Sequence, residues 1–426
     1  MGSHELIALV IFLFTYAMII SEQIHRTTIA MLGGLIMIAF GVLDQKAAIH
    51  YIDFNTIGLL VGMMIIVGIT AQTGVFEYIA IKSAQIVKGE PVKFLIALSL
   101  VTAISSAFLD NVTTVLLVVP VTLSITHQLK IPPIPFLMSE IFASNIGGTA
   151  TLIGDPPNLM IGSAVKELTF LTFIENLALI NLINLAVTIF LFTLIYKKQL
   201  KSNPEFKHQL LNKNARDELK DNDLLVKCMF VIAITIGGFF AHQLLHIETA
   251  TMALMGAFLL LLLTGDKYLA TVLEKVEWTT LFFFIGLFVI VGGLVETGLI
   301  ATLAKKAISW TGGELKATTI LVLWMSAIIS AFVDNIPFVA TMIPMIKEMG
   351  TLGISNLDPL WWSLSLGACL GGNGTLIGAS ANLVVAGLAS KEGHPISFME
   401  YLKVGFPLMI VSVLISMIYV YIRYLF

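Results

Sequence analysis

The sequence predicts an all-α polytopic membrane protein built from two inverted repeats. Of its 426 residues, 57% are hydrophobic and only 12% are charged, and the mean hydropathy is +0.94, far from the averages of soluble domains. Apolar stretches of about 17 to 25 residues, long enough to cross a bilayer as helices, recur along the chain. A glycine-rich stretch at 145–158 returns at 369–382, and the constant offset between the two copies is called the repeat spacing below. Such a long and faithful repeat indicates an internal duplication.

Composition also excludes several classes of protein. The net charge of −3 is small and no basic patch with interleaved aromatic residues is present, so we expect no nucleic-acid partner. The two cysteines, Cys228 and Cys369, lie in apolar stretches without metal-ligand spacing and predict neither a disulfide nor a zinc framework. Residues 5–20 are apolar but lack the basic flank and cleavage site of a signal peptide.

The first half contains a series of apolar spans and one amphipathic interfacial helix (75–90): the spans are 5–21, 27–44, 55–73, 92–109, 112–126 and 170–195. Between them, 136–146 enters the glycine-rich stretch and 158–165 leaves it. Glycine and proline break a helix there, and lipid tolerates a broken helix only where it is buried or lines a wet cavity. Paired breaks in two halves of a membrane protein point to a transporter's binding site.

The halves are joined by a polar linker, 196–223, with few apolar residues to bury. We expect a first repeat at 1–195 and a second at 224–426. Spans at 225–243, 249–264 and 279–297 repeat the start of the first half. Ser106-Ala-Phe-Leu-Asp-Asn111 returns at the repeat spacing as Ser330-Ala-Phe-Val-Asp-Asn335.

The inversion follows from the number of membrane crossings. The runs 92–109 and 112–126 are short and meet at a polar Asp-Asn pair, which predicts a re-entrant hairpin. Each half then crosses five times, about ten crossings in all, so the halves are inverted. With a cytoplasmic linker and both termini outside, the first half follows the positive-inside rule, with Arg26, Lys82, Lys88, Lys93 and Lys130 inside against Lys46 and Lys166 outside. The second half is uninformative.

Three carboxylates carry the predicted chemistry. Asp110, Asp155 and Asp334 fall at predicted membrane depth, where a carboxylate costs about 2.5–3.5 kcal/mol and usually serves an ion or proton path. Hard cations such as Na⁺ prefer oxygen ligands. The hairpin tips and breaks offer such oxygens, and a Na⁺ site would draw on Asn111, Thr149, Thr151, Asn335, Asn373 and Thr375, with Asn158 and Asn382 beside them. No basic residue lies at these tips or breaks in the sequence, which disfavours an anionic substrate.

Structural interpretations compete with these functional ones. Asp-Asn steps favour turns by themselves. Asp155, which Ala379 replaces in the second half, is either a proton site or a cap for 156–165. The Gly58-x-x-x-Gly62 pattern favours helix packing. Cys369 is more typical of a small buried residue than of a thiol ligand.

The stretches Ser106–Thr114, Gly147–Asn158 and Gly367–Asn382 resemble the melanosomal P protein and the arsenite permease and NhaD-type antiporter group of the ion transporter superfamily. The resemblance covers nearly the whole chain. It implies an elevator-type transporter, a homodimer with a scaffold (5–73 and 225–297) and a transport part (92–165 and 316–390). It also implies that substrate and ions bind at the tips and breaks, which adds Thr113, Gly148, Gly154, Gly372 and Gly378 to the candidate residues.

We therefore predict a secondary transporter, not an enzyme, in the bacterial inner membrane. The preferred substrate is Na⁺ or Li⁺ exchanged against protons, with Asp110 and Asp334 alternating between ion and proton and Asp155 sharing that proton. No cofactor beyond Na⁺ or H⁺ is expected. Arsenite or antimonite efflux is the close alternative. Anion or carboxylate transport and a passive channel are weaker alternatives. An intramembrane aspartyl protease is remote, because Gly154-Asp155 lacks the glycine of a GxGD motif.

Overall fold

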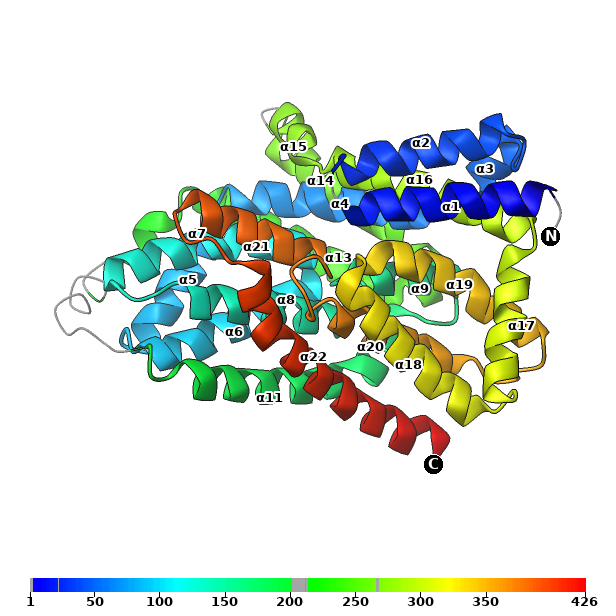
Figure 1. Cartoon of the computed structure of the whole chain (residues 1–426). Coiled ribbons are helices and arrows are strands. Elements are labelled where there is room, and N and C mark those ends of the chain that lie inside the picture. The colour runs from blue at the N-terminus through cyan, green and yellow to red at the C-terminus, as the bar shows by residue number, and fades with distance from the viewer. Residues whose placement is uncertain (1–2, 22, 201–210, 212–213, 266–267) are drawn as a thin grey trace.

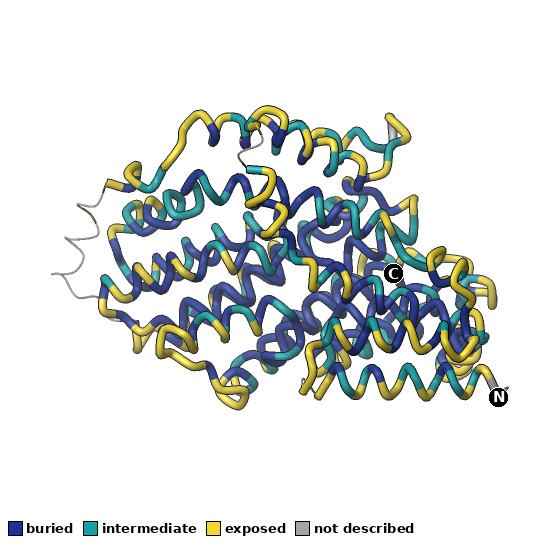
Figure 2. Tube along the Cα trace, turned by 90° about the horizontal axis from the view of Figure 1, so that it is seen from above, coloured by how far each residue is buried: buried dark blue, intermediate teal, exposed yellow. Residues whose placement is uncertain are grey.

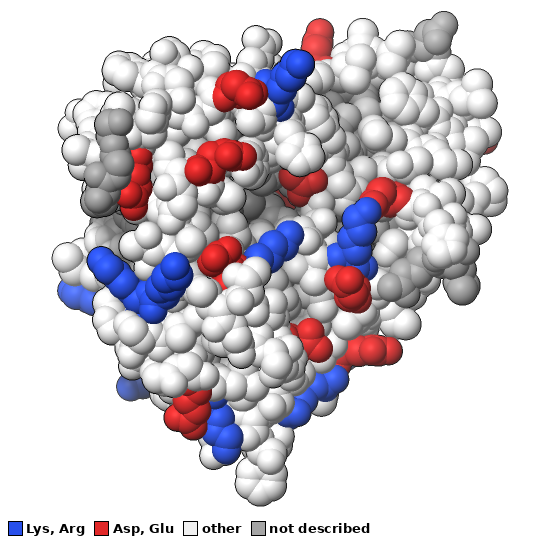
Figure 3. Space-filling view, turned by 90° about the vertical axis from the view of Figure 1, so that its right-hand side faces the viewer, with Lys and Arg blue, Asp and Glu red and all other residues white. Residues whose placement is uncertain are grey.

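The computed structural model describes residues 3–21, 23–200, 211, 214–265 and 268–426. Within these residues the chain is helical and has no strand. Nine of the described helical segments are long and apolar enough to cross a membrane, and α2 and α14 are shorter apolar helices. Figure 3 shows acidic and basic side chains scattered over one end of the molecule, the right-hand end of Figure 1. The predicted all-α polytopic membrane fold is confirmed.

The elements of the first half are α1 Ser3–Ser21, α2 Arg26–Ala39, α3 Gln45–Tyr51, α4 Phe54–Ala71, α5 Val75–Ile86, α6 Pro91–Phe108, α7 Asn111–Leu129, α8 Ile134–Thr149, α9 Pro156–Ala164, α10 Phe170–Phe173, the π-turn η1 Ile174–Ala178 and α11 Leu179–Tyr196. Those that follow are η2 Ala215–Glu218, α13 Asn222–Leu245, α14 Thr249–Thr264, α15 Leu269–Lys275, α16 Trp278–Glu296, α17 Leu299–Thr311, α18 Leu315–Phe332, α19 Asn335–Thr351, α20 Asp358–Gly371, α21 Ser380–Lys391, α22 Phe398–Val420 and η3 Tyr421–Leu425.

The repeat is visible in the way that equivalent helices begin and end. Gly74 and Gly298 are related by the repeat spacing, and both take left-handed backbone angles (φ 78° and 76°) just before α5 and α17. Only glycine adopts this conformation without strain, which explains why both copies carry it. The spacing extends to α3 and α15, two short helices that hydropathy did not reveal. The predicted span 27–44 accordingly ends at Ala39 in α2.

Contacts at the helix ends show that the repeats are inverted. The Tyr51 hydroxyl, just before α4, donates to Glu296 Oε1 at the end of α16, at 3.0 Å. The start of α4 therefore lies beside the end of its repeat equivalent, and the two helices are antiparallel. On the opposite side of the molecule the Thr27 hydroxyl at the start of α2 donates to the Thr279 carbonyl at the start of α16, at 2.7 Å.

Two close helix pairs connect the halves, α2 with α16 and α4 with α14. A Cβ on Gly62 of α4 would lie 2.6 Å from the Ala253 backbone, and one on the equivalent Gly286 of α16 would lie 2.5 Å from Ala30. Glycine is required at both crossings because the backbones touch, as in other small-residue membrane interfaces. The packing interpretation of Gly58-x-x-x-Gly62 is thus confirmed for Gly62.

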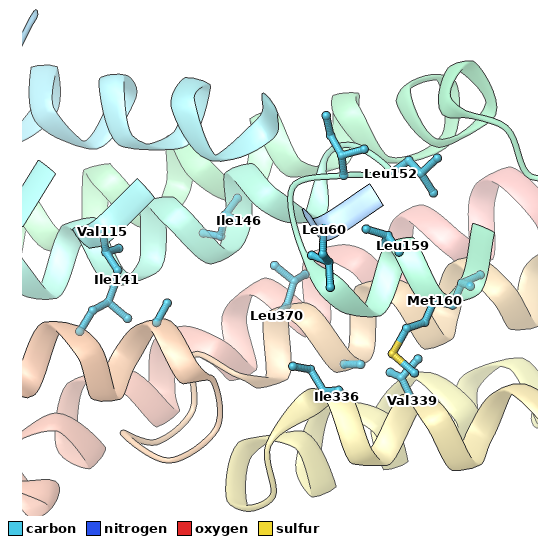
Figure 4. Packing of buried hydrophobic residues seen from close by; sticks show 14 of the residues in the cluster. Leu60, Val115, Ile141, Ile146, Leu152, Leu159, Met160, Ile336, Val339 and Leu370 are labelled. Atoms are coloured by element: carbon cyan, nitrogen blue, oxygen red, sulfur yellow. The ribbon is translucent and has the colours of Figure 1, made fainter. Parts of the chain in front are cut away.

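The hairpins pack on the broken helices, α6–α7 on α8 and α18–α19 on α20 (Figure 1). Figure 2 shows buried residues concentrated in the interior of the molecule, with exposed residues on the outer helices. In the described residues, α8 is buried at every position from Pro135 to Thr149. Apolar side chains surround the first break, and Figure 4 shows Leu159 and Met160 of α9 near Ile336 and Val339 of α19.

Much of the predicted linker lies outside the described residues. Its described end folds as η2 against α5, and the Lys220 amide donates to the Thr73 carbonyl at 3.0 Å. The linker therefore returns to the end of α4 before α13 begins.

Candidate functional site

Both hairpin tips are formed by aspartates that cap the following helix. Asp110 Oδ1 accepts from the Thr113 amide at 2.9 Å, and the Thr113 hydroxyl donates to the other oxygen. Asp334 Oδ1 accepts from the Ile336 amide at 3.1 Å. These caps explain locally why each hairpin turns at an Asp-Asn step. Turn chemistry therefore accounts for part of what both carboxylates do.

Glycines let the broken helices approach the hairpins. A Cβ on Gly147 would overlap the Ala103 backbone of α6, and one on the equivalent Gly371 would lie 2.5 Å from the Ala327 carbonyl of α18. Gly148 and Gly154 also touch each other across the break. Their counterparts Gly372 and Gly378 do the same in the second half. The glycine-rich stretch is thus explained by backbone contact at both ends of the break.

Serine and threonine hydroxyls fasten each break to its hairpin in the same way. Ser106 donates to the Ser144 carbonyl at 2.7 Å, and Ser330 donates to the Ala368 carbonyl at 2.6 Å. The hydroxyl of Thr151 donates to Ala107 of the first hairpin, and that of Thr375 to Ala331 of the second. The Thr149 hydroxyl donates within its own helix, to the Asn145 carbonyl at 2.6 Å. These threonines keep acceptor lone pairs, but their protons are committed to the backbone.

An asparagine network joins the two breaks at the centre of the molecule. Asn145 Oδ1 accepts from Asn111 Nδ2 at 3.1 Å, and Asn145 Nδ2 donates to Oδ1 of Asn373 at 2.9 Å and of Asn382 at 3.0 Å. Asn382 Nδ2 in turn donates to the carbonyls of Gly372 and Thr375. All these amides are buried. Sequence reasoning did not place Asn145 in the site.

The first half has an equivalent network with a cysteine at its centre. Asn158 Nδ2 donates to the carbonyls of Thr149 at 3.0 Å and Thr151 at 2.8 Å. Asn382 bonds the carbonyl of Thr375, the equivalent of Thr151, but its other acceptor is Gly372, the equivalent of Gly148. Asn158 Oδ1 accepts from the Ser365 hydroxyl at 2.5 Å and from Cys369 Sγ at 3.7 Å. Cys369 thus occupies the position equivalent to Asn145 as a buried weak donor.

Asp155 and Glu140 are buried carboxylates that each have one oxygen without a hydrogen-bond partner among the described residues, and of the two Asp155 lies at the tips. It is 0% exposed, Oδ1 accepts from Asn335 Nδ2 at 3.4 Å, and Oδ2 has no hydrogen-bond partner among the described residues. It precedes α9, yet its side chain does not cap that helix. Pro156 and Pro157 in the first two helical positions have no amide to donate, and the amide of Asn158 in the third position donates to the Asp155 backbone carbonyl at 3.0 Å. Of the two interpretations of Asp155, the side-chain cap is therefore wrong.

The tips and the first break enclose a cavity of about 20 Å³, enough for one water or one monatomic ion. Four of the predicted site residues line this cavity: Asp110, Asn111, Asp155 and Asn335. The rest of the lining consists of Arg26, Leu60, Met64, Val112, Pro156, Glu277, Thr280, Ile336 and Ser380. The described residues contain no cluster of three or more His, Cys, Asp or Glu side chains that could hold a metal. Amides, hydroxyls and carboxylates are the groups available to a cation here.

Arg26 corrects the expectation that no basic residue accompanies the tips. Its Nη1 donates to Asp334 Oδ2 at 2.6 Å and to the Ser380 hydroxyl at 2.7 Å. Arg26 begins α2, far before Asp334 in the sequence, so only the fold brings them together. Glu277, just before α16, is a second charged residue that the sequence did not indicate. A larger cavity of about 420 Å³ is lined by Arg26 and Glu277 together with Asp334 and Ser380.

A family model described as "Citrate transporter" (CitMHS) matches residues 16–367. The chain belongs to this family of membrane transporters. An uncharacterized transporter of Mycobacterium tuberculosis is 42% identical to it over 99% of both chains. The P protein of Homo sapiens is 35% identical over 97% of this chain and 59% of its own length. The predicted resemblance to the P protein is confirmed, and this citrate transporter family member spans little more than half of that relative.

Solved structures agree on the fold of this citrate transporter family member. The YdaH transporter of Alcanivorax borkumensis matches with a TM-score of 0.60 and 14% identity, covering 99% of this chain and 98% of that one. MtrF of Neisseria gonorrhoeae matches with a TM-score of 0.61 and 13% identity, covering 91% of this chain and 84% of that one. At such low identity the similarity concerns the architecture alone.

Proposed function

We propose that the protein exchanges Na⁺ or Li⁺ for protons across the bacterial inner membrane. The observation that carries the proposal is Asp155, a fully buried carboxylate with one unpartnered oxygen among the described residues, which lines a cavity the size of a single ion. A buried polar atom without a partner requires an explanation. A proton or a small cation would each satisfy Oδ2, and the two would compete for it. Competition of this kind is the requirement for antiport.

The balance of charge around the cavity favours a cation. Asp110, Asp155 and Glu277 line the cavity, and Asp334 lies beside it. Arg26 is the basic residue of the lining, and it is already paired with Asp334. Three carboxylates therefore face the cavity without a counter-charge from the lining. A transported anion would have to approach them at close range in a medium of low dielectric constant.

A tricarboxylate such as citrate is the second candidate substrate, because the matching family model is described as a citrate transporter and because Arg26 lines the 420 Å³ cavity. Arginine binds carboxylates with two parallel hydrogen bonds. In this conformation, however, Arg26 is engaged by Asp334, and Glu277 shares the same cavity. We therefore rank citrate below the cation. Arsenite, which needs only hydroxyl and amide partners, is a third substrate to test.

We further propose that transport proceeds by an elevator movement of 92–165 and 316–390 against a scaffold of 5–73 and 225–297. Its support is an asymmetry between equivalent scaffold residues. Glu277 lines the cavity at the tips, whereas its counterpart Asp53 accepts from the Ser163 hydroxyl at 2.8 Å, in the last turns of α9. The tips therefore stand nearer to one end of the scaffold. With the linker cytoplasmic, as proposed from loop charge, this conformation faces inward.

The test is proton movement in proteoliposomes that contain a pH-sensitive dye and carry an imposed proton gradient. Na⁺, Li⁺, K⁺, arsenite and citrate are added in turn. We expect Na⁺ or Li⁺ to dissipate the gradient in the wild type and to have no effect with Asp155→Asn. Asp223→Asn, the same change at an exposed residue, is the matched control and should behave as wild type. Dissipation by citrate or arsenite alone would reject the cation proposal.

A further inference from the structure

The two hairpin tips are equivalent in sequence but not in their surroundings. Asp110 and Asp334 are related by the repeat spacing and cap equivalent helices. Arg26 and Ser380, which bind Asp334, correspond by the same spacing to Ala250 and Pro156. Neither alanine nor proline can supply a side-chain hydrogen bond. The first tip therefore lacks the partners that the second tip has.

The partners of Asp334 form a closed, charge-assisted group. Arg26 Nη1 donates to Asp334 Oδ2 at 2.6 Å, and Ser380 Oγ, which also accepts from Arg26, donates to the same oxygen at 2.9 Å. The guanidinium lies 4.9 Å from the centre of the Phe283 ring, which adds a cation–π contact. The Asp334 side chain is 9% exposed. Its charge is thus compensated by a cation that belongs to the protein.

Asp110 has no such compensation from the part of the chain that the structure describes. The Thr113 amide and hydroxyl donate to it, and both belong to the helix that it caps. The charged groups that share its cavity are the carboxylates of Asp155 and Glu277 and the guanidinium of Arg26, which is bound to Asp334. The negative charge left on the first side is therefore available to a mobile cation.

We propose that Arg26 is a tethered cation that fills the cation position of the second repeat, so that a single transported cation binds, on the side of Asp110 and Asp155. This inference rests on the proposed cation antiport, and it adds the number of cations bound per chain in this conformation. Arginine suits the role because its charge is permanent and its planar group holds oxygen acceptors in fixed directions. Removing one member of a buried ion pair leaves the other as an uncompensated charge. Loss of Arg26 should therefore open Asp334 to a second cation.

The experiment counts Na⁺ ions bound by protein held in this conformation. Asn55 Nδ2 lies 3.1 Å from Ser163 Oγ, so an Asn55→Cys/Ser163→Cys cross-link ties the proposed scaffold to the proposed moving part as they now stand. Equilibrium binding of radioactive Na⁺ to the purified, cross-linked protein is then measured. We expect one Na⁺ per chain in the Arg26 background and two with Arg26→Gln. Arg26→Lys, which keeps the charge, should still bind one.

The double variant Arg26→Gln/Asp334→Asn removes both charges together and should return the count to one, with an affinity within about twofold of the starting protein. This variant also keeps the test decisive if Arg26→Gln alone does not fold. A count that stays at one with Arg26→Gln, or a double variant that binds no Na⁺, would overturn the inference while leaving cation transport intact. Absence of Na⁺ and Li⁺ binding in every variant would instead reject the proposed function.

Discussion

The proposed elevator movement predicts a displacement of the tips along the scaffold helices. The cavity at the tips now lies beside residues 60–64 of α4 and residues 277–280 at the start of α16. The repeat equivalents of 277–280 on α4 are 53–56. When the two inverted halves exchange roles, the tips must therefore move from 60–64 to 53–56 on α4. A shift of about seven residues at 1.5 Å per residue gives roughly 11 Å.

Two equivalent cysteine pairs report the two ends of this movement. Asn55→Cys/Ser163→Cys joins groups that are in contact now and should cross-link in the present conformation. Thr279→Cys/Gly387→Cys is the same pair in the second half and should cross-link only after the displacement. A Cβ on Gly387 meets no atom within 4 Å, so the substitution itself is tolerated. The native cysteines are both buried and serve as a constant background.

The first assay is oxidative cross-linking in membranes, read as a mobility shift on a gel. The second measures transport by the cross-linked protein before and after the disulfide is reduced. Both pairs should form, in populations that shift in opposite directions with Na⁺ and pH, and either cross-link should stop transport reversibly. The single variant Thr279→Cys controls for the effect of one thiol. The reasoning is refuted if the Asn55/Ser163 cross-link leaves transport unchanged. It is also refuted if the second pair fails to form in protein that transports.

Three further predictions concern the packing and the charges around the candidate site. Gly147→Ala should lower the stability by about 1–3 kcal/mol, because the added methyl group overlaps the Ala103 backbone. Gly387→Ala, at an open helix position, should be neutral or stabilising by up to about 1 kcal/mol. Melting temperatures in detergent compare the two variants. Asn145→Ala should cost about 1–3 kcal/mol, since it leaves buried amide partners unsatisfied, and unchanged melting would contradict the role of the network. Glu140→Gln should leave cation-dependent proton movement intact in proteoliposomes, because this buried acid bonds to Thr122 of α7 and does not line the cavity at the tips.

Hydropathy and the repeat spacing were sufficient to predict the membrane helices, both hairpin turns and both breaks. These features depend on local chemistry. A cluster of glycines and prolines interrupts a helix, whereas the single prolines Pro120 and Pro344 lie inside α7 and α19. The aspartate of each Asp-Asn step caps the next helix through its side-chain carboxylate. The candidate carboxylates Asp110 and Asp155 were recognised for the same reason, since a charged residue in an apolar stretch stands out without a structure.

Short helices, and the roles of residues that could act in more than one way, could not be predicted from the sequence. The helices α3 and α15 have seven residues each, too few to show a period or a span. The sequence left both roles of Asp155 open, because the two prolines after it remove only the first two amides of α9 and the amide of Asn158 remains for a capping carboxylate. The predicted ligand roles of Thr151 and Thr375 did not anticipate that their protons are given to the hairpin backbone.

Only the tertiary structure decided which charges meet at the centre of the protein. Arg26 was assigned to a loop by the positive-inside rule, and nothing near it in the sequence marks it as a partner of Asp334. Glu277 was likewise not indicated by the sequence, and Asn145, although it begins the glycine-rich stretch, was not among the predicted site residues. The inverted repeat brings residues from opposite ends of the chain to one point, and a local sequence pattern carries no information about pairs so far apart. The sequence shows that the two halves are equivalent, but the pairing of Arg26 with only the second tip depends on how the halves pack.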